Sequence, residues 1–339
     1  MADKSAVVIG GGSWGTALAK VLAENGHQTR LWCREPELVE AINTQHENTL
    51  YLPGIALPDN LVAYGTLSEA LAARDIKAVM LVVPSHHLRS VARELGELLP
   101  DDAPIIAATK GIENESLEFS SQILAGTLPA RLHPQLTFLS GPSFAKEVAL
   151  GIPTGVLVAG ADERWTVAAQ EVLGNQRLRV YRTDDVIGVE IGGALKNVVA
   201  IAAGISDGMG FGHNSRAALI TRGLAEIARL ALRLGAHPLT MSGLSGMGDL
   251  VLTCTGDLSR NRHVGIELGK GKKLPQILSE MTMVAEGVKT AKSAYQLAQR
   301  EGVEMPLTEG IYRVLYENTD PRVEVAELMA RSPRPERDD

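Results

Sequence analysis

Short apolar runs alternate with segments of helical spacing along the first half of the chain. Residues 6–9 (Ala-Val-Val-Ile) predict a buried strand, and the helical spacing of residues 16–25 ends before Gly26. Further strands are predicted at 28–33, 78–83, 104–108 and 136–139, and helices between them at 36–46, 67–73, 86–98 and 115–127. This alternation predicts an α/β fold with a doubly wound, mostly parallel sheet.

The pattern changes near residue 185, after which nearly every periodic segment is helical. The predicted helices are 188–206, 214–234, 260–269, 275–280, 286–301, 307–317 and 322–331. The first of them is apolar almost all round, as expected for a helix in the middle of a domain. We therefore expect a dinucleotide-binding domain at 1–185, an all-helical domain at 186–331 and a flexible, proline-broken tail at 332–339.

Composition narrows the class of protein. A chain of 339 residues is long enough for about two domains, and its 45% hydrophobic and 22% charged residues are near globular averages. No apolar stretch approaches roughly 18 uninterrupted residues, and the N-terminus lacks the features of a secretory signal. A soluble, cytoplasmic protein without integral membrane association is expected. Cys33 and Cys254 are far apart in sequence and are expected to be reduced thiols.

The net charge of −7 argues against binding to nucleic acid or membrane surfaces. Any anionic ligand must therefore meet a few cations placed for it. No cluster of His, Cys and carboxylate residues indicates a metal site, and His86-His87 is interpreted as a helix start rather than a ligand pair.

A glycine-rich motif links the first predicted strand to the first predicted helix. Gly10, Gly12 and Gly15, with Ser13 and Trp14 between them, match G-x-G-x-x-G. Gly10 permits a tight turn, Gly12 lets the backbone approach a pyrophosphate, and Gly15 lets helix and strand pack closely. A plain glycine-rich turn is the alternative. The position between strand and helix favours a Rossmann-like dinucleotide site.

Cofactor choice is normally set at the end of the second strand, where a carboxylate favours NAD and an arginine favours the 2′-phosphate of NADP. Arg34 falls at about that position, and no carboxylate occupies residues 31–33. The sequence therefore favours NADPH, with NADH tolerated. The alternative is that Arg34 is a solvated charge at a strand end.

Lys196 is the most informative residue of the second half. Its neighbours one helical turn away are Gly192, Gly193, Val199 and Ala200, so we expect space beside the lysine. An ammonium in an apolar helix is costly, and desolvation lowers its pKa toward the range useful for proton transfer. A snorkelling lysine is the alternative, which a position in the middle of a helix disfavours.

Two loops follow predicted strands at the edge where such sheets bind ligands. Lys110 follows the strand at 104–108, and Gly141 and Ser143 follow the strand at 136–139. The lysine and the loop amides can reach a substrate or a nicotinamide. A surface charge and ordinary turn chemistry are the alternatives.

Two further segments carry polar residues suited to a substrate. Asp249 can accept hydrogen bonds from a substrate hydroxyl or from Lys196, although Asp after Gly is also a common helix cap. Ser259 is placed to cap a helix whose first-turn amides, with Arg260 and Asn261, receive a phosphate. An ordinary surface cap is the alternative.

Taken together, these segments resemble the bacterial glycerol-3-phosphate dehydrogenase family over almost the whole chain. The resemblance rests on residues 10–16 (GGGSWGT), 109–111 (TKG), 140–147 (SGPSFAKE), 192–197 (GGALKN), 248–250 (GDL) and 259–262 (SRNR). It implies an N-terminal Rossmann-like domain, a helical C-terminal domain and an active site between them. It also implies NAD(P)-dependent interconversion of dihydroxyacetone phosphate and sn-glycerol 3-phosphate for glycerophospholipid synthesis, without a metal, by a homodimer.

The resemblance also assigns roles to residues. Lys196 is expected to be the proton donor and acceptor. The residues expected at the substrate are Lys110, Gly141, Ser143, Lys196, Asn197, Asp249, Thr253, Ser259, Arg260 and Asn261. Those expected at the cofactor are Gly10, Gly12, Ser13, Trp14, Gly15, Arg34, Lys110, Ala145, Arg260, Val284 and Glu286.

Two other functions are compatible with the same two-domain arrangement. A β-hydroxyacid or phosphogluconate-type dehydrogenase also carries a lysine on a helix, and assays with each substrate would separate the enzymes. A redox-sensing NAD(P)-binding module would use the fold without turnover. The combination of Lys196, Lys110 and a phosphate-like site speaks against the sensor.

Overall fold

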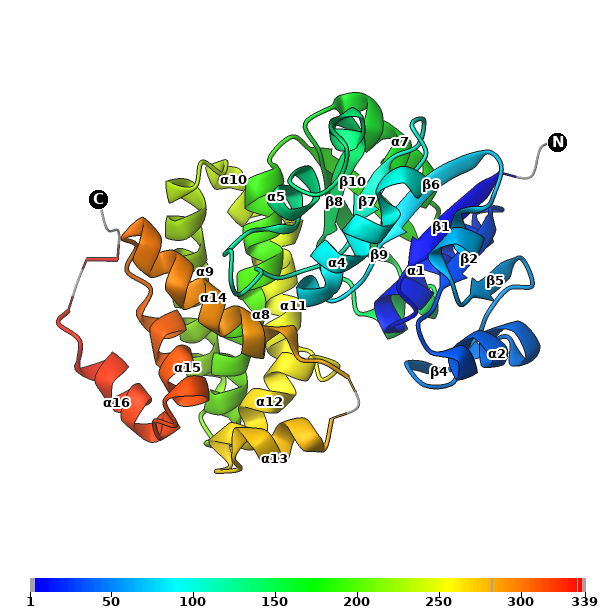
Figure 1. Cartoon of the computed structure of the whole chain (residues 1–339). Coiled ribbons are helices and arrows are strands. Elements are labelled where there is room, and N and C mark those ends of the chain that lie inside the picture. The colour runs from blue at the N-terminus through cyan, green and yellow to red at the C-terminus, as the bar shows by residue number, and fades with distance from the viewer. Residues whose placement is uncertain (1–3, 282, 334, 337–339) are drawn as a thin grey trace.

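The structure, a computed structural model, describes residues 4–281, 283–333 and 335–336. A sheet with helices on both faces forms the N-terminal part, and a cluster of helices forms the C-terminal part beside it (Figure 1). The last strand of the sheet ends at Thr183, and the first helix of the C-terminal part begins at Val186. The change from sheet to helices therefore falls where the sequence predicts it; the division into domains at residue 185 stays a prediction.

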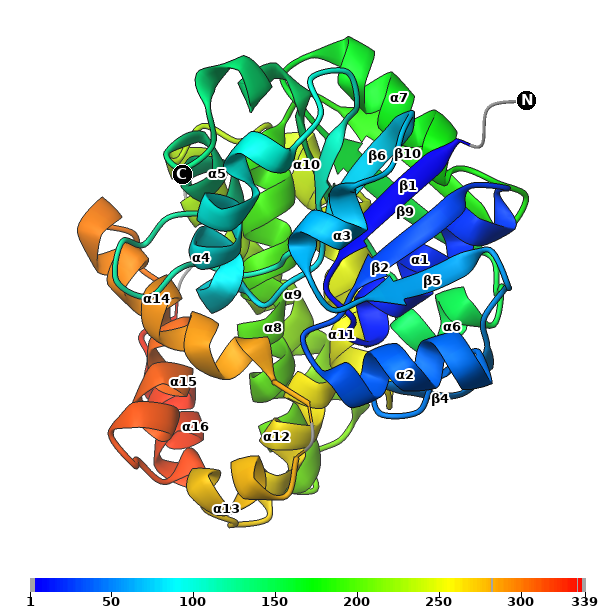
Figure 2. The same cartoon turned by 45° about the vertical axis from the view of Figure 1, so that its right-hand side comes forward.

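The sheet has eight strands in the order β10-β9-β8-β7-β6-β1-β2-β5. All neighbouring pairs are parallel except β8 and β9, which are antiparallel. Figure 2 shows β6, β1, β2 and β5 side by side. The strands are β1 (Ser5–Ile9), β2 (Gln28–Trp32), β5 (Leu61–Tyr64), β6 (Ile76–Leu81), β7 (Ile105–Ala107), β8 (Leu136–Ser140), β9 (Thr154–Ala159) and β10 (Leu178–Thr183), and a separate antiparallel pair is formed by β3 (Glu47–Asn48) and β4 (Leu52–Ala56). The predicted doubly wound, mostly parallel sheet is confirmed.

Alternate residues of β1 enter two different cores. Ala6 and Val8 belong to the core on one face of the sheet, and Val7 and Ile9 belong to the core on the other. Helices cover both faces, which explains why β1 is a continuous apolar run. These helices are α1 (Ser13–Glu24), α2 (Pro36–Gln45), α3 (Leu67–Leu71), α4 (Ser85–Leu95), α5 (Ser120–Ala125), α6 (Ala145–Ala149) and α7 (Glu163–Leu173), with short 3-10 turns η1 (Gly96–Leu98) and η2 (Ala130–Gln135).

The helical part is built around α8 (Val186–Gly208), which lies among the other helices (Figure 1). The prediction that this helix is buried is confirmed, since eighteen of its residues are buried. The other helices are α9 (His213–Arg233), α10 (Pro238–Met241), the π-helical turn η3 (Leu244–Gly248), α11 (Asp249–Thr255), α12 (Arg260–Gly269), α13 (Leu274–Ser279), α14 (Glu286–Glu301), α15 (Pro306–Tyr316) and α16 (Pro321–Ala330).

The contact between α8 and α12 is made by glycines. A Cβ atom on Gly204 would lie 2.1 Å from the carbonyl oxygen of Arg262, and one on Gly265 would lie 2.1 Å from that of Ile201. Gly208 and Gly269 meet in the same way one turn further on. The two backbones therefore touch without intervening side chains, which fixes α12 against the helix that carries Lys196.

Among the described helices, only α8 has the length and apolar composition of a membrane span. Of its most apolar stretch, 83% is buried by other parts of the protein. A core helix passes the same test of length and composition, so this helix is weak evidence for a membrane span.

Several elements differ from the sequence prediction. The strands β5, β9 and β10 and the helix α7 were missed, although β10 alternates buried Leu178 and Val180 with exposed residues. The predicted helix at 115–127 is wrong in its first turn, because α5 begins at Ser120. Residues Glu113 and Glu118 before it instead bind Arg89 of α4. Within the predicted tail at 332–339, residues 334 and 337–339 lie outside the described residues.

Candidate active site

The glycine-rich loop follows β1 and leads into α1. Gly10 has a φ of +128°, and a Cβ atom there would lie 2.4 Å from the carbonyl oxygen of Val82. A Cβ on Gly15 would lie 1.8 Å from the carbonyl oxygen of Gly10, whereas one on Gly12 would meet nothing within 4 Å. Gly10 and Gly15 are thus required by the turn, and Gly12 leaves an open cradle before the start of α1. A pyrophosphate fits this arrangement.

Asn48 supports this loop from a distant part of the chain. Its side-chain amide donates to the carbonyl oxygen of Gly11 at 2.9 Å and to Oγ1 of Thr16 at 2.7 Å. The residue is fully buried. Sequence reasoning missed Asn48, because nothing in its local sequence shows that β3 returns to the loop.

The end of β2 carries the predicted cofactor-selecting arginine. The side chain of Arg34 is 71% exposed and pairs with Glu35 at 3.1 Å. The hydroxyl of Tyr51 donates to the same carboxylate at 3.3 Å. Arg34 is therefore accessible to a ligand, and Tyr51 is a neighbour that the sequence did not indicate.

Glu286 connects the two parts of the chain. It begins α14, and its carboxylate accepts a hydrogen bond from the hydroxyl of Ser85, the first residue of α4, at 2.9 Å. Burial raises the pKa of Glu286, opposed by the hydrogen bonds from Ser85 and by the charge of Arg260. Val284 precedes it with a side chain 44% exposed. Arg260 and Glu286, both predicted at the cofactor, therefore lie close together.

Lys196, Asp249 and Lys110 form a connected group of charges. The Lys196 ammonium donates to Oδ1 of Asp249 and, at 3.1 Å, to Oγ1 of Thr253. The Lys110 ammonium donates to Oδ2 of Asp249 at 2.9 Å and to the carbonyl oxygen of Gly141 at 3.3 Å. The carboxylate of Asp249 thus accepts hydrogen bonds from both lysines. Gly248, not Asp249, is the N-cap of α11, so the interpretation of Asp249 as a partner of Lys196 holds and that of a helix cap does not.

Burial controls the protonation of this group. Desolvation lowers the pKa of Lys196 below its ordinary value, with Asp249 acting in the opposite direction and Lys110 adding to the decrease. Burial alone would raise the pKa of Asp249, but the charges of Lys110 and Lys196 outweigh it and hold the pKa below its ordinary value. The lysine is therefore suited to giving up a proton while its partner stays ionised.

Other parts of the protein approach α8 closely at the two glycines that precede Lys196 by one turn. A Cβ on Gly192 would lie 2.4 Å from the carbonyl oxygen of Ser245, and one on Gly193 would lie 2.7 Å from the hydroxyl of Ser140. The prediction that these glycines leave room is wrong at Gly192, whereas Gly193 also lines a pocket next to Lys110. They let η3 and the end of β8 approach α8 closely, which brings Asp249 within reach of the lysine.

The loop after β8 lies against Lys110. Gly141 has a φ of +124°, and its carbonyl oxygen also accepts from the hydroxyl of Ser143 at 2.9 Å. Ala145 begins the short helix α6 three residues after Pro142 and is half-buried. Gly141 and Ser143 are therefore next to the charged group, as their position after the strand predicts.

Asn261 holds three helices together. Its amide nitrogen donates to Oδ1 of Asn197 on α8 at 2.9 Å, and its own Oδ1 accepts from the backbone N–H of Gly287 on α14 at 2.9 Å. Ser259 caps α12 by accepting from the N–H of Arg262 at 3.2 Å, which confirms the predicted cap. Arg260 starts that helix, and its side chain remains exposed.

A pocket lies behind Lys110, between the ends of β7 and β8 and helix α8. Thr109, Ser140, Glu190 and Gly193 are among its lining residues. Glu190 accepts from the backbone and hydroxyl of Ser121, and burial raises the pKa of its carboxyl to about 7. This contact joins α8 to α5 next to the charged group.

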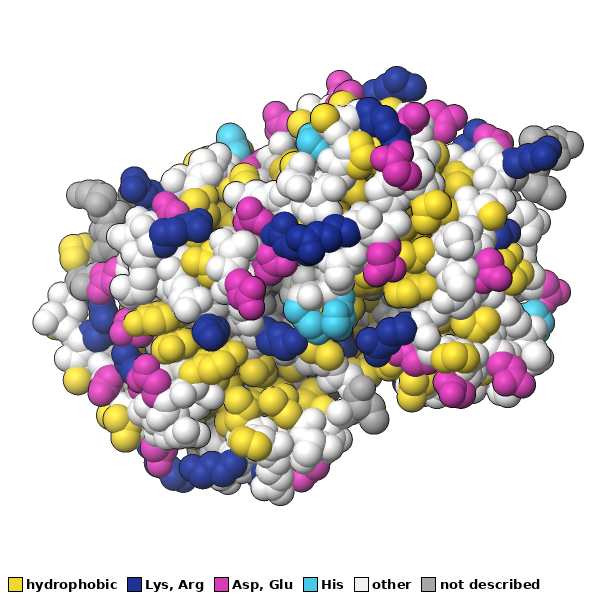
Figure 3. Space-filling view, in the orientation of Figure 1, with side chains coloured by type: hydrophobic (Ala, Val, Ile, Leu, Met, Phe, Trp, Pro, Cys, Tyr) yellow, Lys and Arg dark blue, Asp and Glu magenta, His cyan; other side chains and the backbone are white. Residues whose placement is uncertain are grey.

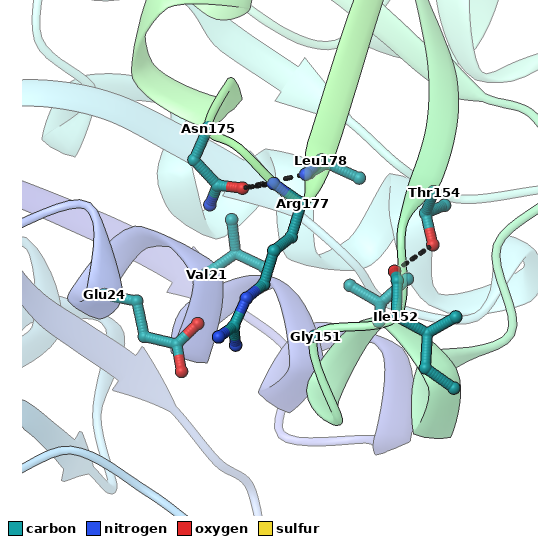
Figure 4. Close-up of a pocket in the computed structure, with 9 residues that line it drawn as sticks. Val21, Glu24, Gly151, Ile152, Thr154, Asn175, Arg177 and Leu178 are labelled. Carbon is teal, nitrogen blue, oxygen red and sulfur yellow. Dashed lines mark hydrogen bonds between the residues drawn. The ribbon is translucent and has the colours of Figure 1, made fainter.

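A second hollow, drawn in Figure 4, lies at the end of α1 and the beginnings of β9 and β10. Arg177 and Glu24 line it, and none of the residues predicted from the sequence does. It therefore lies apart from the site described above.

No metal centre is found in the part of the chain that the structure describes, where no three His, Cys, Asp or Glu side chains are grouped to hold an ion. His86 and His87 lie in the first turn of α4, as the sequence predicts for a helix start.

A mostly parallel sheet with a glycine-rich dinucleotide cradle, joined to a helical part that carries a buried lysine, is typical of dehydrogenases that transfer hydride with a nicotinamide cofactor. The chain belongs to the NAD-dependent glycerol-3-phosphate dehydrogenase family. The N-terminal model of that family matches residues 5–166, and its C-terminal model matches residues 185–326. The resemblance in the sequence is thus confirmed at the level of the family.

Individual relatives agree with this assignment. The chain is 54% identical over 329 residues to "Glycerol-3-phosphate dehydrogenase [NAD(P)+]" of Myxococcus xanthus, covering 97% of this chain and 98% of that one. A relative of the same name from Geobacter sulfurreducens is 54% identical over 330 residues, with the same coverage. The crystal structure of glycerol-3-phosphate dehydrogenase from Coxiella burnetii matches with a TM-score of 0.91 at 40% identity and covers 97% of this chain and 99% of that chain.

Proposed function

We propose that this protein interconverts dihydroxyacetone phosphate and sn-glycerol 3-phosphate with NAD(P), and so supplies glycerol 3-phosphate for glycerophospholipid synthesis. The observation that carries the proposal is the buried Lys196–Asp249–Lys110 group, which lies where the loops after the strands meet the helical part. Membership of the family and the activity named for its relatives support the same substrate pair.

Lys196 is the proposed proton donor in the reducing direction. A bound nicotinamide supplies the hydride for the ketone carbon. Negative charge then grows on the ketone oxygen, where the Lys196 ammonium stabilises it and donates the proton. Asp249 and Thr253 accept hydrogen bonds from Lys196 and orient it. In the oxidising direction, neutral Lys196 accepts the hydroxyl proton.

The substrate contacts are proposed from the same geometry. Lys110 presents a second cation next to Lys196, and Arg260 supplies a guanidinium at the start of α12 for the substrate phosphate. Burial lowers the pKa of this guanidinium, opposed by the charge of Glu286. The remaining proposed substrate residues are Gly141, Ser143, Asn197, Asp249, Thr253, Ser259 and Asn261. Of these, Asn197 and Asn261 bind each other, so their proposed role is to hold α8 and α12 in register beside the substrate.

The proposed cofactor site runs from the glycine-rich loop to α14. Gly12 with the start of α1 receives the pyrophosphate, and Arg34 favours the 2′-phosphate, so NADPH is the preferred cofactor. The other proposed cofactor residues are Gly10, Ser13, Trp14, Gly15, Lys110, Ala145, Arg260, Val284 and Glu286. We also propose that the protein is a homodimer and acts in the cytoplasm. Sedimentation of the purified protein tests whether it is a dimer.

An absorbance assay tests substrate and cofactor together. Oxidation of NADPH and of NADH is followed in the presence of dihydroxyacetone phosphate. The comparison substrate is a β-oxo acid, the oxidised form of a β-hydroxyacid. We expect turnover with dihydroxyacetone phosphate and a higher kcat/KM with NADPH. Turnover with the comparison substrate alone would contradict the proposed function. Equal kcat/KM for the two cofactors would contradict only the preference for NADPH.

A further inference from the structure

Two adjacent histidines at the start of α4 face outward between the two parts of the chain. His86 and His87 are exposed, whereas Ser85 and Leu88 on either side of them are buried. The buried pair anchors the turn, since the Ser85 hydroxyl binds Glu286 of α14. The imidazole rings of His86 and His87 lie 4.1 Å apart between centroids. The first turn of α4 is therefore held in place by its buried residues, and two imidazoles project from it to the surface.

Cations from two other elements lie near these imidazoles. Lys289 follows Glu286 by three residues on α14, and Glu286 binds Ser85, so α14 places Lys289 beside the start of α4. Burial lowers the pKa of His87, and the charges of Arg34 and Lys289 add to the decrease. Figure 3 shows histidine side chains in the middle of this face with Lys or Arg side chains on either side. We call His87, Arg34 and Lys289 the cationic triad.

The carboxylates nearest the cationic triad already have partners. Glu35 binds Arg34 and the hydroxyl of Tyr51, and Glu286 binds Ser85. Among the described residues no carboxylate lies within ion-pair distance of His87 or Lys289. Lys289 is therefore a cation without a carboxylate partner among the described residues, and Arg34 shares its partner Glu35 with Tyr51. An anion that binds between these two cations and His87 is attracted by both charges and favours the protonated imidazole.

We propose that His87 and Lys289, together with Arg34, bind the phosphate group on the adenine ribose of NADPH. The inference rests on the proposed function, because it extends the cofactor preference assigned to Arg34. The position of Arg34 decides which phosphate is bound, since the end of the second strand is where the ribose hydroxyl falls in this fold. The pyrophosphate belongs to the cradle at Gly12 instead.

The proposal gives the cofactor preference a pH dependence. A phosphate dianion favours the protonated form of His87, so NADPH takes up a proton as it binds. The groups nearest His87 are Arg34, Lys289 and His86, while Glu35 and Glu286 are bound to Arg34 and Ser85. Burial, and after it the charges of Arg34 and Lys289, lowers the pKa of His87 in the free protein. Affinity for NADPH should therefore rise as the pH falls from 8 to 6.5, while affinity for NADH stays level.

Direct binding of each cofactor tests the proposal without turnover. Dissociation constants for NADPH and NADH are measured by calorimetry at pH 6.5 and pH 8 for His87→Gln and Lys289→Gln. We expect each variant to bind NADPH about tenfold more weakly at pH 6.5, the usual scale of one lost charge-assisted contact, and to bind NADH within about twofold of the parent. The matched controls are His213→Gln, an exposed histidine on α9, and Lys292→Gln, on the same helix as Lys289.

A conservative variant separates charge from structure. His87→Arg keeps a cation but removes the titration, so it should retain the preference for NADPH and lose most of its pH dependence. The pH dependence of NADPH affinity that remains in this variant comes from the phosphate, whose own pKa is about 6. If His87→Gln weakened both cofactors equally, or if His87→Arg kept the full pH dependence, the proposal would be overturned.

The variant Arg34→Ala shows which of the two proposals fails. If Arg34→Ala loses NADPH selectively and His87→Gln and Lys289→Gln do not, the cationic triad is refuted while the assignment of Arg34 stands. If none of the three variants affects NADPH selectively, the preference for the 2′-phosphate itself is refuted. Reduction of dihydroxyacetone phosphate, measured in parallel, reports separately on the proposed activity.

Discussion

Lys110 and Asp249 are separated by 139 positions in the sequence, and their side chains form an ion pair at 2.9 Å. Lys110 follows the sheet, and Asp249 begins a helix of the C-terminal part. The second oxygen of the same carboxylate accepts from Lys196. The proposed proton donor and a proposed substrate cation therefore share one buried acceptor, so a change at any of the three alters the other two.

Replacement of Lys196 by Ala should reduce turnover by roughly the 10²–10⁴ typical of lost acid–base catalysis. The affinity for NADPH should stay nearly unchanged, because Lys196 contacts Asp249 and Thr253 rather than the glycine-rich loop. Steady-state kinetics and direct binding measure the two effects. Lys292→Ala on α14 is the control, and near-normal turnover in Lys196→Ala would remove this lysine from the mechanism.

The pH dependence of ketone reduction should report the protonation of Lys196. Reduction requires the ammonium form, so kcat/KM should fall as the pH rises through the pKa of Lys196, which burial places below that of an ordinary lysine. In Asp249→Asn the stabilising carboxylate is lost, so this decline should move to lower pH. The oxidation of glycerol 3-phosphate should show the opposite trend. A decline at the same pH in both proteins would contradict the coupling between Asp249 and Lys196.

Replacement of Arg260 by Ala should raise the KM for dihydroxyacetone phosphate strongly. Arg260 begins α12, next to first-turn amides that suit an oxyanion. Part of the loss should appear in kcat, because phosphate binding also orients the ketone. NADPH dissociation is measured separately, since Arg260 lies near Glu286.

Unphosphorylated dihydroxyacetone provides the comparison for Arg260. It should be a poor substrate for the parent, and Arg260→Ala should narrow the difference between the two substrates. If the variant discriminated between them as well as the parent does, the phosphate site would have to be placed elsewhere, with Lys110 as the next candidate.

Replacement of Gly265 by Ala should destabilise the fold. The added Cβ would lie 2.1 Å from the carbonyl oxygen of Ile201, and neither backbone can move without separating α8 from α12. Overpacking of this kind typically costs about 1–3 kcal/mol. Chemical denaturation measures the loss. Gly212→Ala is the control, because a Cβ there meets nothing within 4 Å, and equal stability of the two variants would show that the helices can separate without cost.

The elements that the sequence predicts well are those with a local cause. The strand at β1 is buried on both faces and reads as a continuous apolar run, and the glycines at 10, 12 and 15 mark the turn that follows. Lys196 is recognisable because a charge interrupts an apolar helix. The missed edge strand β10 mixes polar and apolar residues, so its short alternation was not distinguished from a loop.

The parts of the site that the sequence did not predict depend on contacts between distant segments. Asn48 contacts Gly11, 37 positions away, and the Cβ positions of Gly192 and Gly193 are closed by Ser245 and Ser140. Spacing along one helix shows that bulk is missing from a face. It does not show whether a ligand or another backbone occupies that face.

The ion pair between Lys110 and Asp249 also changes how affinity should be understood at this site. Both groups already have partners in the protein alone, as do Ser85 and Glu286 across the same boundary. A ligand that binds one of these groups must first break its hydrogen bond within the protein. The new contact therefore replaces an existing one and is not added to it. A measured dissociation constant is therefore a difference between two sets of bonds, and a variant that breaks the internal pair can bind a ligand more tightly than the parent even though it has lost a polar group.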